Sequence, residues 1–89
     1  MIFRWDAQKA ANLKKHGIDF HEAATVLNDT FSTTFPAEAH SRFEARFVTV
    51  GMSSRGRILV VVHTEYDNMI RIIGARRATS HERRFYEEG

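Results

Sequence analysis

Arginine is the residue type in this chain that is best suited to chemistry on phosphate groups. The second half of the chain holds eight basic residues, and all are arginine: Arg46, Arg55, Arg57, Arg71, Arg76, Arg77, Arg83 and Arg84. A guanidinium group can bind a phosphate through two hydrogen bonds, whereas a lysine ammonium acts as a point charge. Because these arginines interrupt the apolar runs ILVVVH and MIRII, we expect a small sheet that meets a polyanion along its rim and one face. RNA is the polyanion that this pattern favours.

A histidine and a glutamate in the most apolar run could supply acid–base chemistry. Metal-free RNA cleavage needs an activated 2′-hydroxyl, stabilised charge on the phosphate and a proton for the 5′-oxygen. His63 and Glu65 are two residues apart in RILVVVHTEY, so on a strand they share a face. A three-residue turn after this strand places Arg57 and Arg71 on that face too, and the isoleucines on the other. A two-residue turn reverses this parity and mixes the charges with the isoleucines.

We prefer the three-residue turn because it separates polar from apolar side chains. A solvent-facing polar patch is the alternative interpretation of His63 and Glu65. Arg76 and Arg77 lie where the last strand is expected to meet the C-terminal helix, whose free amides would add to an anion site. The alternative there is a surface ion pair with Glu82 or Glu44. The predicted catalytic residues are His63, Glu65, Arg71 and Arg76, and phosphate contacts are predicted for Arg46, Arg57 and Arg77.

Capping residues mark the elements that must position these side chains. Asp6 and Asp19 are suited to begin helices over residues 7–16 and 19–28, and Gly17 to end the first of them. Thr79, with Glu82 three residues on, matches a capping box for a last helix. Strands are expected over residues 1–5, 31–35, 46–51, 57–66 and 69–75. The order β-α-α-β-β-β-β-α predicts an α+β fold with a twisted, mostly antiparallel sheet packed by helices.

Composition limits the class of protein. The 89 residues are expected to form a single domain, residues 1–89, with 43% hydrophobic content and a net charge of +2. There is no cysteine, and the five histidines lack HxxxH or HExxH spacing, so we expect no metal and no cofactor. No apolar run approaches the ~20 residues needed to span a bilayer, and the N-terminus lacks a signal-peptide pattern. A cytoplasmic protein without membrane contact is expected.

The segments WDAQKAANLKKHGIDFHEA, RFVTVGMSSRGRILVVVHTE, IRIIGARRAT and HERRFYEE, in this order, resemble the BrnT family of bacterial type II toxin–antitoxin pairs. The resemblance covers Phe3 to Glu88. It implies a RelE-like fold and an endoribonuclease that inhibits translation. It also implies a BrnA-like DNA-binding antitoxin, through which operator DNA would be bound. The retained Lys15-His16-Gly17 adds Lys15 to the predicted phosphate contacts. Gly74 departs from the family, which more often has serine there, and activity would be reduced if that hydroxyl matters.

Two other functions fit the same residues. The arginine face could bind nucleic acid without cutting it, in which case affinity would fall steeply with salt. It could also bind an acidic or amphipathic segment of an antitoxin. The pair of His63 and Glu65 favours catalysis, because simple binding does not require a titratable couple inside a sheet.

Overall fold

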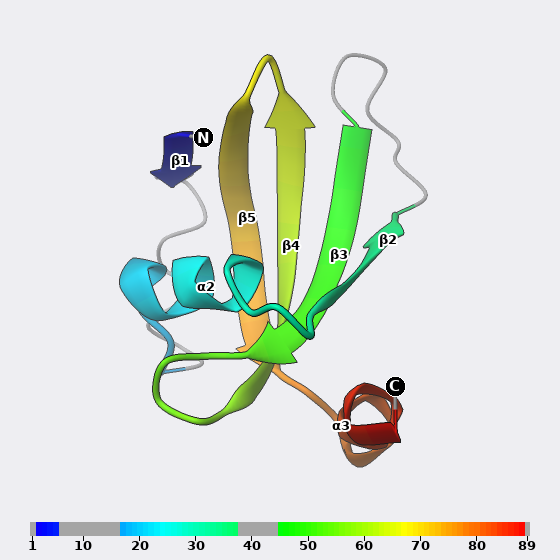
Figure 1. Ribbon diagram of the computed structural model, residues 1–89. Helices are drawn as coiled ribbons and strands as arrows, with labels where there is room; N and C mark the ends of the chain where they lie inside the picture. The colour runs from blue at the N-terminus through cyan, green and yellow to red at the C-terminus, as the bar shows by residue number, and fades with distance from the viewer. Residues whose placement is uncertain (1, 6–16, 38–44, 89) are drawn as a thin grey trace.

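A five-stranded sheet is the framework of the chain (Figure 1). The computed structural model describes residues 2–5 as backbone, residues 17–37 and residues 45–88. The strands are β1 (Ile2–Trp5), β2 (Thr33–Pro36), β3 (Ala45–Met52), β4 (Ile58–Tyr66) and β5 (Met69–Arg77). Their spatial order is β1-β5-β4-β3-β2; β1 runs parallel to β5, and the other neighbours are antiparallel. The α+β class, the mostly antiparallel sheet and the central place of β4 agree with the sequence prediction.

Two helices flank the sheet in the described part of the chain: α2 (Phe20–Leu27) and α3 (Ser80–Glu88). The helix predicted over residues 7–16 lies outside the described residues. Asp19 caps α2 by accepting a hydrogen bond from the Glu22 amide at 2.7 Å, and Gly17 before it has φ +67°. Neither of the two helices is long and apolar enough to cross a membrane.

One face of the sheet packs against α2 and holds the main core. Ile18, Ala23 and Val26 are buried there against apolar strand residues, and the cluster is completed by Leu59, Val61, Ile70, Ile72 and Ala75. Alternate residues of β4 project to opposite faces. Residues 60, 62, 64 and 66 therefore lie on the other face of the sheet, which we call the second face. Val50 and Val60 are buried on the second face, outside the main cluster.

Helix α3 lies at the end of the sheet away from the β4–β5 hairpin (Figure 1), and none of its residues is buried. Its Phe85 ring packs on Phe35 of β2, with the ring centroids 5.5 Å apart. The Tyr86 hydroxyl donates to Asp29 Oδ2 at 2.6 Å, and this bond raises the pKa of Tyr86 to about 12. An aromatic contact therefore attaches this helix to β2, and a hydrogen bond attaches it to the segment that follows α2.

The β4–β5 turn differs from the prediction. Tyr66 pairs with Met69, so the turn contains two residues, Asp67 and Asn68, with φ of 52° and 63°. Left-handed conformations at both positions suit the twist of a tight hairpin, and Asp and Asn tolerate them. The predicted three-residue turn is wrong. The register then shifts between Val62 and His63, which leaves one extra residue in β5 as a bulge.

Candidate functional site

A row of arginines crosses the second face of the sheet. Arg46 of β3 pairs with Thr64 of β4, and Thr64 pairs with Arg71 of β5. Residues paired in this way share a face, and strands two apart are separated by roughly 9.5 Å. Arg46 and Arg71 are therefore placed to bind one phosphate above the buried Thr64.

The neighbouring row of the second face is apolar and partly open. Phe35, Val48, Val62 and Gly74 are paired successively across β2, β3, β4 and β5. A methyl group built on Gly74 would meet no atom within 4 Å. The surface next to Arg71 is thus unobstructed at Gly74, where a ribose or a base could approach the backbone closely.

Arg76 is on the same face but is held by α3. It pairs in register with Val60, four residues along β4 from Thr64 and therefore about 13 Å from the arginine row. Its two terminal nitrogens donate to Glu82 at 2.7 and 2.8 Å, and this guanidinium lowers the pKa of Glu82 to about 2. Glu82 also forms a capping box with Thr79. The ion pair with Glu82, named above as the alternative, is the one the structure contains.

His63 and Glu65 face α2, on the opposite side of the sheet from Arg71. His63 pairs in register with Ile72, and Glu65 with Ile70. The two-residue turn produces this arrangement, so the prediction that His63, Glu65 and Arg71 share a face is wrong.

The His63 ring is 1% exposed and is held inside the sheet. Its Nε2 lies 2.7 Å from Thr49 Oγ1, and Thr49 Oγ1 lies 2.8 Å from Thr34 Oγ1. Its Nδ1 lies 3.7 Å from Glu65 Oε1, and the ring stacks on Phe47. Burial lowers the pKa of His63, and the Glu65 charge opposes this shift in part. The ring is therefore neutral near pH 7 and links three strands.

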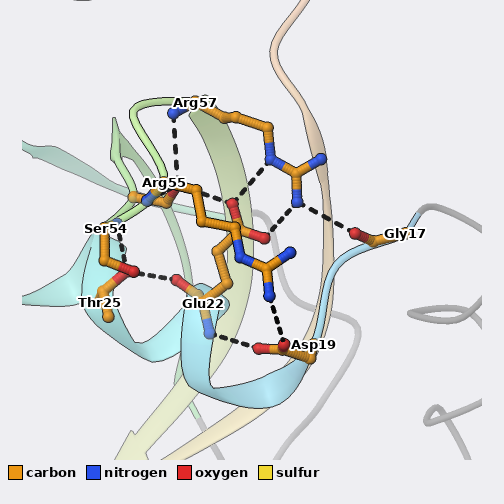
Figure 2. A network of polar contacts seen from close by, with 8 residues as sticks. Gly17, Asp19, Glu22, Thr25, Ser54, Arg55 and Arg57 are labelled. Atoms are coloured by element: carbon orange, nitrogen blue, oxygen red, sulfur yellow. Dashed lines mark hydrogen bonds and ion pairs between the residues drawn. The ribbon is translucent and has the colours of Figure 1, made fainter.

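Arg57 belongs to a network that joins α2 to the loop between β3 and β4 (Figure 2). Arg57 Nε donates to Glu22 Oε2 at 2.8 Å, and its Nη2 donates to Glu22 Oε1 and lies 3.0 Å from the Gly17 carbonyl. Ser53 Oγ donates to Glu22 Oε2 at 2.7 Å. The Glu22 side chain is 1% exposed, and the hydrogen bonds from Arg57 hold its pKa below the usual value against the effect of burial.

The same network reaches the surface through a second arginine. Arg55 Nη2 lies 3.4 Å from Asp19 Oδ2, and the Ser54 amide donates to Thr25 Oγ1 at 2.9 Å (Figure 2). Arg57 therefore has a structural explanation in its contacts with Glu22, on the α2 side of the sheet. The predicted phosphate contact at Arg57 would have to compete with this ion pair.

Of the remaining residues predicted to bind phosphate, the one that the structure describes does not lie in the arginine row either. Arg77 is exposed and pairs with Leu59, which faces α2, so Arg77 and Arg76 point to opposite faces. Both lie inside β5, which extends two residues beyond the predicted strand. Lys15 lies outside the described residues. Sequence reasoning missed Thr64, the centre of the arginine row, and Thr49, the hydroxyl that binds His63; only the strand register could have revealed them.

Comparison with known proteins identifies the class first. Residues 5–82 match the family described as the ribonuclease toxin, BrnT, of type II toxin–antitoxin systems. This chain belongs to that family. A toxin of a type II system has an antitoxin partner, and a ribonuclease toxin has RNA as its substrate.

A solved structure shares the fold. The 1.1 Å crystal structure of the Brucella abortus ribonuclease toxin, BrnT, superposes with a TM-score of 0.67 at 24% sequence identity. The match covers 90% of this chain and 100% of the Brucella chain. No curated protein sequence matches.

Proposed function

We propose that this protein is an endoribonuclease that binds the RNA backbone on the second face of the sheet. The observation that carries the proposal is the row formed by Arg46, Thr64 and Arg71, on the face that α2 leaves uncovered. Two guanidinium groups from alternate strands can bind the same phosphate from both sides. Family membership supplies RNA as the substrate class.

The proposed reaction needs positive charge more than any other feature. The 2′-oxygen attacks the phosphorus and loses its proton, while the bond from phosphorus to the 5′-oxygen breaks and that oxygen gains a proton. Negative charge grows on the phosphate oxygens between these events. Fixed guanidinium groups stabilise such charge without reorganisation. Arg46 and Arg71 would supply this stabilisation, so the mechanism we propose is independent of metal ions.

His63 receives a positioning role in this proposal. A phosphate on the second face is separated from the His63 ring by the sheet itself, because His63 projects towards α2. The ring also has Thr49 as its hydrogen-bond partner. We therefore assign His63 to positioning, by fixing β4 against β3 so that Thr64 and Arg46 stay in register.

Membership of the BrnT family supports a proposed cellular role. We propose that the enzyme adopts the catalytic arrangement of RelE-like toxins, inhibits translation by cleaving RNA in the cytoplasm, and is neutralised by a BrnA-like DNA-binding antitoxin. Contact with operator DNA would then occur through the antitoxin. Arg76 is a further phosphate contact in this proposal whenever Glu82 releases it.

The experiment compares two arginine variants with a matched control. Purified protein is incubated with single-stranded RNA in EDTA, and initial cleavage rates are measured for the wild type, Arg46→Ala, Arg71→Ala and Arg83→Ala. Arg83 is an exposed arginine on α3. Loss of one charge-stabilising donor is expected to lower kcat about 10²–10³-fold at Arg71 and Arg46. Arg83→Ala should cleave at the wild-type rate.

Salt dependence separates cleavage from simple binding. Removing one arginine that binds a phosphate should reduce the slope of log affinity against log salt by about 0.7 for a single strand. RNA that binds with this slope but stays intact would show a binding module. A wild-type protein that cleaves only after addition of a divalent metal would overturn the metal-independent mechanism.

A further inference from the structure

We infer that the tip of the β4–β5 hairpin is a nucleobase subsite, in which Tyr66 stacks on the base next to the phosphate held by the arginine row. This inference rests on the proposed function, because it places the base relative to that phosphate. The hairpin tip lies at the end of the sheet opposite α3 (Figure 1).

Tyr66 has the placement that a stacking residue needs. It follows Thr64 by two residues on β4, so its side chain projects from the same face as the arginine row. Two residues along a strand correspond to about 6.7 Å, which is the scale of one nucleotide. Tyr66 is 69% exposed, although tyrosine usually buries much of its ring. An exposed aromatic ring beside phosphate-binding groups is the arrangement that proteins use for single strands.

A hollow of about 180 Å³ is present at the same place. It is lined by six consecutive residues, Glu65 to Ile70, which include Tyr66 and Met69. This volume is smaller than typical small-molecule sites of roughly 300–1,000 Å³, and it suits a single flat ring. Asn68 contributes an amide to the lining, and amides form hydrogen bonds with base edges.

The charges around the subsite determine the orientation of a bound nucleotide. The hollow at the hairpin tip is lined by two carboxylates, Asp67 in the turn and Glu65, which projects from the α2 face. The row one step down the sheet carries Arg46 and Arg71 on the second face. A phosphate is repelled from the carboxylates and attracted to the arginines. A base with an amino group can instead donate a hydrogen bond to a carboxylate. The nucleotide is therefore oriented with its phosphate on the arginine row and its base at the hairpin tip.

The test measures affinity with an RNA that cannot be cleaved. A short single-stranded probe with 2′-O-methyl riboses is titrated by fluorescence anisotropy against the wild type, Tyr66→Phe, Tyr66→Ala and Phe31→Ala. Phe31 is also exposed, at 79%, and lies outside the proposed site, so it is the matched control. Tyr66→Ala is expected to weaken binding about 5- to 150-fold, while Tyr66→Phe, which keeps the ring, stays within about twofold. Phe31→Ala should bind as the wild type does.

Abasic probes show whether the ring contacts a base. A series of probes, each lacking one base, is measured against the wild type and Tyr66→Ala. One abasic position should remove the difference between the two proteins, because the stacking partner is then absent. Equal losses at every position would mean that Tyr66 acts through the fold, and the subsite would be rejected.

The outcomes distinguish the subsite from the proposed function. A wild-type protein that cleaves RNA with Arg71 dependence, while Tyr66→Ala binds normally, would refute the subsite alone. A wild-type protein that neither binds nor cleaves single-stranded RNA would refute both. Circular dichroism spectra of both Tyr66 variants establish that the hairpin change leaves the fold intact.

Discussion

The Glu22 carboxylate provides the sharpest test of how the fold is held together. Replacing Glu22 with glutamine keeps the shape of the side chain but removes its charge. The carboxylate accepts two hydrogen bonds from Arg57 and one from Ser53, and its side chain is 1% exposed. The amide of glutamine offers one oxygen and places an NH₂ group against a donor of Arg57. At least one charge-assisted hydrogen bond is therefore removed, at a cost of about 1.5–3 kcal/mol.

This destabilisation is large enough for routine calorimetry. A change of 1 kcal/mol shifts the Tm of a domain of this size by about 4–8 °C, so the expected decrease for Glu22→Gln is roughly 6–24 °C. The matched control is Glu87→Gln, which removes a charge from an exposed position of α3. Its Tm should stay close to that of the wild type, because exposed charges contribute little.

The pH dependence of stability provides a second, independent test of the same interaction. The pKa of Glu22 is lowered in the folded state, chiefly by hydrogen bonds from Arg57. A carboxyl with a depressed folded pKa stabilises the protein above its unfolded pKa, and this contribution is lost as pH falls through the folded value. The stability difference between the wild type and Glu22→Gln should therefore shrink as pH falls below about 4.5. A Glu22→Gln protein that melts with the wild type at pH 7 would refute the reasoning.

Three further perturbations test other parts of the structure. Gly74→Ala should stabilise the protein by about 0.5–1 kcal/mol in urea unfolding, because the new Cβ meets open space. Gly51→Ala should destabilise the protein by about 1–3 kcal/mol, because its Cβ would lie 2.9 Å from the Ser32 side chain. The opposite ranking of the two variants would contradict the packing. Tyr86→Phe removes the hydrogen bond from Tyr86 to Asp29. Amide hydrogen exchange should then become faster in α3, while the amides of β4 stay protected. Unchanged exchange in α3 would show that this hydrogen bond does not hold the helix. Burial lowers the pKa of His63, so the contribution of this residue to stability is present above about pH 6.5 and declines below it. The decline should be absent in a folded His63→Gln variant. Identical profiles of stability against pH for the wild type and this variant would argue against the buried neutral ring.

Local signals in the sequence predicted the two described helices and the central strand well. Asp19 caps α2 and Thr79 with Glu82 forms the predicted capping box, because these interactions depend only on residues three apart. The central apolar strand became β4, the middle of the sheet. Such features need no knowledge of distant contacts.

The candidate site was less predictable because it depends on one turn. Asp67 and Asn68 both adopt left-handed conformations, and this tight turn moves Arg71 to the face opposite His63. The preference for separating polar from apolar side chains was misleading here. A histidine among isoleucines is tolerated because the Thr49 hydroxyl, from another strand, is its hydrogen-bond partner. That partner cannot be inferred without the register of β3.

The parallel pairing of β1 with β5 has a consequence for biosynthesis. Ile2 is translated well before its partner Met69, because β2, β3 and β4 lie between them in the sequence. Strand β1 must therefore wait for β5 before it joins the sheet. The arginine row, which runs from β3 to β5, is likewise assembled only after β5 has been made. During translation there is thus an interval, lasting until β5 emerges, in which the proposed RNA-binding surface does not yet exist.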